Sequence, residues 1–267
     1  MKSKIFNVSL LLLFILVTSC TTSGSKSDSS QKSNQVESST RLMSYNIRNA
    51  KGLDDVTDYD RIASIINNSA PDIIGVQELD SVTGRSQGVD VLNVLAEKTE
   101  MFSTYAAAID YDGGKYGIGV LSKEKPLSVI RVPLPCSREP RMLLIVEMGE
   151  YYFGNTHFSL NEEDRLKAVN IIKEEAKKLN SDKPFFLVGD INATPESVVL
   201  QSLYDEFTSL VSPDEYTIPA TNPNRTIDYI FAYNANGTWE ALDNSGVLAE
   251  DLASDHRPLY ADVKIGF

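Results

Sequence analysis

The chain has 267 residues, of which 42% are hydrophobic, and its 25 basic and 37 acidic residues give a formal net charge of −12. This length and composition predict a globular protein with a sizeable core, and the acidic balance disfavours proteins that coat DNA or RNA, because the overall field repels polyanions. Two cysteines, Cys20 and Cys136, are too few for a four-thiolate zinc site or a disulfide framework.

The first 20 residues have the pattern of a secretion signal. Lys2 and Lys4 precede an apolar run over residues 5–17, which is shorter than the roughly 20 residues that a membrane-spanning helix needs. The run ends in Val-Thr-Ser-Cys, which resembles the lipobox of bacterial lipoproteins. We therefore expect a signal peptide over 1–19, lipidation of Cys20 and a flexible, serine-rich tether over 20–39. The protein is then expected outside the cytoplasm, anchored to a bacterial membrane.

Residues 40–267 are predicted to form one domain, because short apolar runs alternate with helical periods and no second linker interrupts them. Helices are predicted where apolar residues recur at helical spacing, at 59–69, 89–98, 161–179 and 195–203. Strands are predicted at 41–47, 72–77, 102–109, 117–122, 127–133, 141–148, 151–158, 184–188, 227–232, 240–247 and 259–265. This order predicts a four-layer α/β sandwich, in which two packed, mostly antiparallel sheets are flanked by helices.

Polar residues stand where several of these apolar runs end or begin. A single residue of this kind is most often a turn residue, but both histidines of the chain belong to the set. If the strand ends converge at one rim, they form a pocket of carboxylates, amides and imidazoles. The set consists of Asn46, Glu78, Asn155, His157, Asp190, Asn192, Asp228, Asp255 and His256.

The residue types in this set indicate metal-assisted chemistry. Glu78 and Asn46 offer hard oxygen ligands, which suit Mg²⁺ or Ca²⁺ better than a soft metal. A histidine beside a carboxylate can act as general base, and Asp228 can orient His256 if their strands are neighbours. Asp190 and Asn192 lie two residues apart, so both can address an attacking water.

The motifs MSYNIR, PDIIGVQELD, GNTHFSL, LVGDINATP, TIDYIF and SDHRPLYADV resemble, in order, those of the endonuclease/exonuclease/phosphatase superfamily over residues 41–265. The resemblance implies a Mg²⁺-dependent phosphoesterase, with Mn²⁺ as a second possible ion. It implies that Glu78 is the main metal ligand with Asn46 and Asp255 nearby, and that Asp190 and Asn192 align the water and the phosphate. His256 would be the base, oriented by Asp228, and His157 with Asn155 would bind the phosphate.

Further residues are candidates for substrate binding. Arginine makes bidentate contacts with phosphate, so Arg48, Arg85 and Arg141 are expected to grip the substrate, with Tyr116 lining the pocket. The alternative for each arginine is a surface ion pair. Cys136 is expected to pack rather than react, since no histidine is near it in the sequence.

Three functions remain open on the sequence alone. The favoured one is hydrolysis of a phosphate mono- or diester by in-line attack of water, on a small organic phosphate or a lipid headgroup. The second is a secreted nuclease, which is disfavoured because the basic residues are spread along the chain. The third is a non-catalytic binding protein of the same fold. We expect a monomer without a stable nucleic-acid partner, held at the membrane by its lipid anchor.

Overall fold

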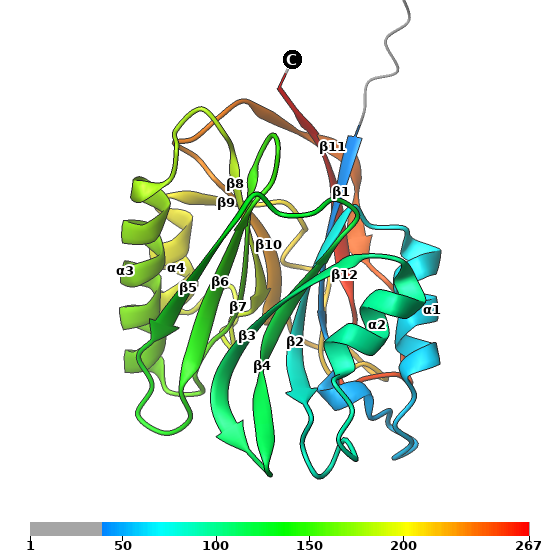
Figure 1. Ribbon diagram of the computed structural model, residues 1–267. Helices are drawn as coiled ribbons and strands as arrows, with labels where there is room; N and C mark the ends of the chain where they lie inside the picture. Colours follow the sequence, from blue (N-terminus) through cyan, green and yellow to red (C-terminus); the bar gives the residue numbers. More distant parts are fainter. Residues whose placement is uncertain (1–38, 267) are drawn as a thin grey trace, which may run out of the picture. The chain divides into compact units, whose positions relative to one another are not determined.

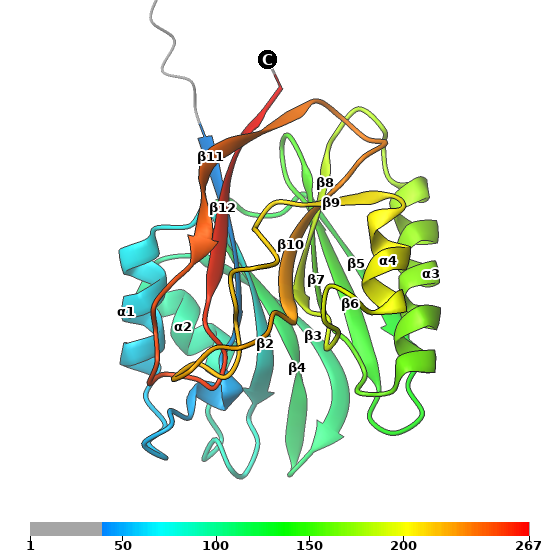
Figure 2. The same ribbon diagram turned by 180° about the vertical axis from the view of Figure 1, so that it is seen from behind.

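The computed structural model describes residues 39–266 (Figures 1 and 2). The predicted signal peptide and Cys20 lie outside the described residues, as does all of the predicted tether except Ser39. Within residues 39–266, no helix is long and apolar enough to span a membrane.

Two six-stranded sheets form the centre of the fold. The first consists, in spatial order, of β11 (Trp239–Val247), β12 (Leu259–Ile265), β1 (Ser39–Asn46), β2 (Ile73–Ser81), β4 (Gly114–Ser122) and β3 (Phe102–Tyr111). The second consists of β5 (Ser128–Leu134), β6 (Arg141–Glu147), β7 (Tyr152–His157), β8 (Phe185–Asp190), β10 (Asp228–Tyr233) and β9 (Phe207–Ser209).

Helices cover the outer faces of both sheets, which gives the predicted four layers (Figure 1). They are α1 (Tyr59–Ser69) and α2 (Val91–Thr99) on the first sheet, and α3 (Glu162–Lys178) and α4 (Val198–Tyr204) on the second. The view from behind keeps the two helix pairs on opposite sides (Figure 2). The predicted fold class is therefore confirmed.

Side-chain caps determine where the helices begin. Asp58, Asp90, Asn161 and Ser197 each accept a hydrogen bond from the backbone N–H three residues later. The prediction for α1 matches its observed bounds, but the predicted starts at 89 and 195 are too early, because the caps Asp90 and Ser197 precede α2 and α4. The three-residue β9 and the short 3₁₀ helix η1 (Arg48–Ala50) have no periodic pattern and were not predicted.

One parallel pair in each sheet aligns the strand ends. β1 and β2 pair in parallel and are connected through α1, while β7 and β8 pair in parallel and are connected through α3. The remaining pairs are antiparallel. A parallel connection needs a crossover, and here a helix supplies it each time. All four strands run toward the same end of the sandwich, the lower end in Figure 1, whereas Ser39 begins β1 at the opposite end.

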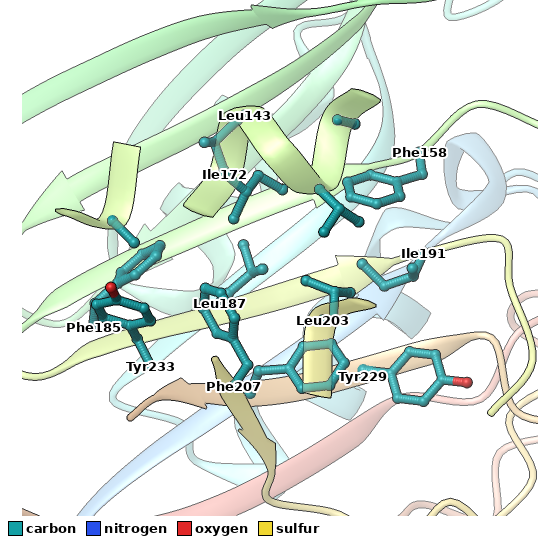
Figure 3. Close-up of a cluster of buried hydrophobic side chains, with 14 of the residues drawn as sticks. Leu143, Phe158, Ile172, Phe185, Leu187, Ile191, Leu203, Phe207, Tyr229 and Tyr233 are labelled. Carbon is teal, nitrogen blue, oxygen red and sulfur yellow. The ribbon is translucent and has the colours of Figure 1, made fainter. Parts of the chain in front are cut away.

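Three apolar clusters fill the spaces between the layers. One lies between the sheets and includes Leu42, Val120 and Phe186. The second lies between the first sheet and α1 and α2. The third joins the second sheet to α3 and α4, and Figure 3 shows part of it, with Phe185 and Phe207 labelled. The ring of Phe207 packs edge to face on those of Phe185 and Phe231. These clusters hold the strands rigidly, so the side chains at the strand ends have fixed positions.

Candidate active site

Strand-end residues from both sheets meet at the lower end of the sandwich in Figure 1. β1, β7 and β8 end there, β10 begins there, and the loop before β12 approaches the same place. Hydrogen bonds and ion pairs, within each sheet and across the gap between the sheets, join a set of polar residues: Asn46, Glu78, His157, Asp190, Asp228 and His256.

His256 and Asp228 form a buried pair. Nδ1 of His256 lies 2.9 Å from Oδ2 and 3.1 Å from Oδ1 of Asp228. β10 lies in the second sheet and β12, which follows His256, lies in the first, so the two strands are neighbours across the gap between the sheets rather than within one sheet. The loop from Ser254 makes the contact possible, since the Ser254 hydroxyl donates to the carbonyl of Asn46 and accepts the His256 N–H.

The charge on His256 follows from this setting. Burial opposes a charged imidazole, but the carboxylates of Asp228, Asp190 and Asp255 outweigh that effect and raise the pKa of His256 to about 10. The ring is therefore protonated at neutral pH and its Nε2 can donate a hydrogen bond. This charge state favours a donor role for His256 over the base role expected from the sequence.

The carboxylate of Asp190 lies near three other polar side chains of the site. Its Oδ2 lies 3.5 Å from Nε2 of His157, 3.8 Å from Nε2 of His256 and 3.1 Å from Nδ2 of Asn46. Its Oδ1 accepts the backbone N–H of Asn192 at 2.9 Å. Burial and the charge of Asp228 raise the pKa of Asp190, so this carboxylate is a better proton acceptor than a solvated one.

His157 has the opposite charge state to His256. Burial, the guanidinium of Arg141 and the imidazolium of His256 lower the pKa of His157 well below its ordinary value. Asp190 thus lies between a neutral and a protonated imidazole. Such a pair offers both a lone pair and a donor to a group bound between them.

Glu78 reaches the site through an irregularity in β2. The sequence predicted that this strand ends at Gln77, which is wrong: β2 continues to Ser81. Val76 pairs with Gly119 but Leu79 pairs with Gly117, so β2 carries one extra residue opposite β4. At this β-bulge Glu78 has a φ of 61°, a backbone conformation that re-aims its side chain, and Oε1 accepts from Nδ2 of Asn46 at 3.1 Å.

The donors around Glu78 fit a divalent cation. Burial raises the pKa of Glu78, and the negative charge of Asp255 raises it further. A cation between these two carboxylates would relieve their repulsion, and oxygen ligands suit Mg²⁺ or Mn²⁺. Asn46 fits the ligand role less well in this orientation, because it presents its amide nitrogen to Glu78 while its oxygen accepts the N–H of Arg48.

A second acidic group could also hold a metal by geometry. One ligand atom from each of Asp190, Asp228 and His256 lies within 4.8 Å of the others. Both oxygens of Asp228 already contact Nδ1 of His256, however, so this carboxylate is engaged. Asp228 is therefore less available to a cation than a free carboxylate would be.

Two of the predicted site amides are placed differently from the expectation. The side chain of Asn155 is fully buried between the sheets, where it accepts from Gln77 at 2.7 Å and donates to the carbonyls of Val76 and Gly119. It therefore has no free polar atom for a phosphate, which corrects the sequence assignment. Asn192 lies next to Asp190, but its Nδ2 donates to the carbonyl of Phe158 at 3.1 Å.

A sequence model of the endonuclease/exonuclease/phosphatase family matches residues 43–256, a range that includes every residue of this site. The chain belongs to this family. No curated protein matches the chain in sequence.

Several solved structures have a fold similar to that of this chain, although their sequence identity to it is low. An endonuclease/exonuclease/phosphatase from Beutenbergia cavernae is 23% identical with a TM-score of 0.69, over 85% of this chain and 72% of that chain. A mannosyl-6-phosphatase from Bacteroides thetaiotaomicron is 17% identical with a TM-score of 0.64, over 84% and 99%. TDP2 from D. rerio, solved with a single-strand DNA product, is 18% identical with a TM-score of 0.66, over 85% and 99%.

The three arginines of this chain that were expected to bind substrate lie in different environments. Arg85 is already saturated: its guanidinium pairs with the buried Asp80 through two hydrogen bonds of 2.7 and 2.9 Å and donates to Asn49 at 2.6 Å. It also stacks on the rings of Tyr111 and Tyr116, at 4.5 and 5.4 Å from their centroids. Arg85 therefore holds Tyr116 in place and is poorly available to a ligand.

Arg141, Arg48 and Tyr116 remain open to the site. The charge of Arg141 lowers the pKa of both Glu78 and His157, so its guanidinium lies near both residues. Arg48 directly follows the end of β1 and, within residues 39–266, pairs with no carboxylate; its guanidinium donates to the carbonyl of Gly52 at 3.3 Å. Burial and the charge of Glu78 raise the pKa of Tyr116, which keeps its hydroxyl protonated beside that carboxylate.

Sequence reasoning missed two residues that support the site. Gln77 joins the sheets by donating to Asn155 and to the hydroxyl of Ser44. Asp80 is 1% exposed and holds Arg85. Both belong to the polar run that follows the apolar part of β2, and two charged residues there at a spacing of two were the available signal.

Proposed function

We propose that this protein is a divalent-metal-dependent phosphoesterase that hydrolyses a small organic phosphate by in-line attack of water. Its family consists of hydrolases that act on phosphoester bonds. The observation that carries the proposal is the position of Asp190 between the imidazoles of His157 and His256, beside the Glu78 and Asp255 carboxylates.

Each residue has a role in the hydrolysis that follows from its charge state. Asp190, with its raised pKa, orients the attacking water and accepts its proton. As the water oxygen bonds to phosphorus, the bond from phosphorus to the alcohol oxygen breaks, and the departing alcohol takes a proton from solvent. Protonated His256 donates from Nε2 to a phosphoryl oxygen, and Asp228 keeps that ring charged and oriented. Neutral His157 and the guanidinium of Arg141 contact the remaining phosphoryl oxygens.

Glu78 and Asp255 would hold the cation, with Asn46 fixing the Glu78 carboxylate by a hydrogen bond. A bound Mg²⁺ or Mn²⁺ supplies Lewis-acid stabilisation of the charge on the phosphoryl group. The third hypothesis, a non-catalytic binding protein, is the least supported, because acceptor, donor and cation-binding groups are all present at one place.

Two substrate classes share this bond chemistry. The net charge of −12 favours a small organic phosphate over a nucleic acid. The mannosyl-6-phosphatase supports this choice, because it is a sugar phosphatase with a similar fold. A nuclease is the second candidate, because the likeness in fold extends to a DNA-bound TDP2.

A substrate screen with added Mg²⁺ or Mn²⁺ tests the proposal. It compares bis-p-nitrophenyl phosphate, p-nitrophenyl phosphate, sugar phosphates, inositol phosphates, sphingomyelin and single- and double-stranded DNA. Asp190→Ala and His256→Ala should each lower kcat by roughly 10²-fold or more while leaving the fold intact. EDTA should abolish turnover and Mg²⁺ should restore it. Turnover that survives both substitutions or persists in EDTA overturns the assignment.

We also propose, from the sequence alone, that residues 1–19 are a signal peptide and that lipidation of Cys20 anchors the protein as a monomer outside the cytoplasm. Cys20→Ser should then move the protein from the membrane fraction to the soluble fraction. Unchanged membrane association would refute lipidation.

A further inference from the structure

A pocket adjoins the proposed active site on the side of Arg141. It lies between the loop that joins β5 to β6 and the turn that precedes α3, and its volume is about 360 Å³. Its walls include Cys136, Arg138, Arg141 and Ser159. Pockets that hold small organic ligands start at about 300 Å³, so this one has room for part of a substrate.

The pocket is connected to the reaction centre through two of its residues. Arg141 lines the pocket, and its charge also acts on Glu78 and His157. Ser159 follows His157 by two residues at the end of β7. A phosphoester whose phosphoryl group lies between His157 and His256 can therefore extend its alcohol part toward the pocket.

The cations of the pocket are incompletely neutralised. In the part of the chain that the structure describes, Arg138 pairs with no carboxylate. Arg141 pairs with Glu139 through one terminal nitrogen, but its Nε is buried and has no hydrogen-bond partner. Two guanidinium groups thus face a single carboxylate, and a buried N–H without a partner is costly. An anion supplies the missing charge and acceptors.

The loop that carries Arg138 is held in place before any ligand binds. Oδ2 of Asp164, in the first turn of α3, accepts from the N–H of Ser137 at 2.7 Å, from the Ser137 hydroxyl at 2.8 Å and from the Ser159 hydroxyl at 3.2 Å. These bonds join both walls of the pocket to one carboxylate. A preorganised wall lowers the entropy lost when a ligand binds.

We propose that this pocket binds a second anionic group, a phosphate or a carboxylate, on the alcohol part of the substrate. The inference rests on the proposed phosphoester hydrolysis and specifies its substrate class as phosphoesters of anionic alcohols. Arg138 recognises the second anion, and Arg141 lies between this pocket and the reacting phosphoryl group. Arg138 selects substrate and takes no part in the bond cleavage.

Three open-chain six-carbon phosphate esters test this selectivity in the full-length protein with Mg²⁺. Sorbitol 6-phosphate has no second anion, 6-phosphogluconate adds a carboxylate and sorbitol 1,6-bisphosphate adds a phosphate. We expect about tenfold higher kcat/KM for one or both anionic esters, the size of one charge-assisted contact, and the two arms separate carboxylate from phosphate. Equal kcat/KM for all three esters overturns the proposal.

Variants test whether the pocket causes the higher kcat/KM for anionic esters. Arg138→Ala should bring the ratio of kcat/KM between anionic and neutral esters close to one, and Arg138→Lys should keep part of it. Arg131→Ala is the matched control, because Arg131 is an exposed arginine of the neighbouring strand β5 that does not line the pocket. A preference that survives Arg138→Ala, or that Arg131→Ala removes equally, contradicts the assignment.

Cys136 provides a readout that needs no turnover. Its thiol lines the pocket and is partly exposed, so 6-phosphogluconate should slow its alkylation by iodoacetamide more than sorbitol 6-phosphate does. Peptide mass spectrometry of the Cys20→Ser protein reports this rate at Cys136. Equal alkylation rates overturn the pocket proposal. A protein that hydrolyses none of the esters in the substrate screen but protects Cys136 retains the pocket and loses the proposed function.

Discussion

Nδ1 of His256 lies 2.9 Å from Oδ2 of Asp228, although Asp228 begins a strand of the second sheet and His256 precedes a strand of the first. The pair therefore forms only when the two sheets pack face to face. Catalytic geometry in this protein depends on the central core between the sheets as much as on the loops.

Asp228→Asn should preserve the shape of this pair and remove its charge. The pKa of His256 then falls, because the largest of the charges that raise it is removed, and kcat should drop about 10²-fold or more. Steady-state kinetics and the NMR titration of the His256 ring measure both effects. Asp205→Asn, on an exposed carboxylate, is the control. Unchanged kcat in Asp228→Asn would show that the pair is not used.

Glu78→Gln should weaken the cation site, because it removes one of the two carboxylates. We expect at least a roughly tenfold rise in the Kd for Mg²⁺, measured by calorimetry, together with a smaller rise in Tm on adding Mg²⁺. Glu240→Gln removes an exposed carboxylate of β11 and should change neither quantity. Equal Mg²⁺ affinity in wild type and Glu78→Gln would move the cation elsewhere.

Asn155→Ala should reduce stability rather than chemistry. It leaves Gln77 and the carbonyls of Val76 and Gly119 without their partner between the sheets, at a cost of roughly 3 kcal/mol in the free energy of unfolding. Urea denaturation measures this cost, and kcat per folded molecule should stay within a few-fold. Full stability with a 10²-fold lower kcat would restore the phosphate-binding role that the sequence suggested.

Arg85→Ala should destabilise the fold by about 2 kcal/mol, because it leaves the buried Asp80 carboxylate without its partner. The double variant Asp80→Ala/Arg85→Ala should cost less than the sum of the two single variants, since removing both partners leaves no unpaired charge. Additive costs in this double-mutant cycle would mean that Arg85 is free to bind substrate.

Asp164→Asn should show that the hydrogen bonds between Asp164 and the loop before β6 make a pH-dependent contribution to the free energy of unfolding. Hydrogen bonds from the Ser137 N–H and hydroxyl lower the pKa of Asp164, so its stabilising effect is present above the ordinary value of 3.8 and disappears as the pH falls through the lower, folded-state value. Asp164→Asn should therefore be less stable than wild type at pH 6, and the difference should shrink below pH 3.8. A difference independent of pH would contradict this account.

Most of the fold follows from local patterns. α1 and β12 have their predicted bounds, because Asp58 and Pro71 delimit the helix and a clear apolar run marks the strand. The bulge at Glu78 could not be predicted, since it depends on how β2 pairs with β4, a strand more than 30 residues later. The caps that shorten α2 and α4 were visible in the sequence, but apolar residues before them suggested earlier starts.

The site was predicted in its composition but only partly in its roles. Asn155 and His157 lie two residues apart and share a face of β7, so a common role was a reasonable expectation. Two residues along a strand span about 6–7 Å, however, and this distance places Asn155 inside the core while His157 lies at its edge. The saturation of Arg85 was equally hidden, because it depends on the burial of Asp80.

β1 runs from the end of the sandwich where the described chain begins to the end that carries the candidate active site. It enters the fold at Ser39 and delivers Asn46 to the site, about 23 Å further along the strand. An attachment through the chain that precedes Ser39 therefore joins the sandwich at the end opposite the site.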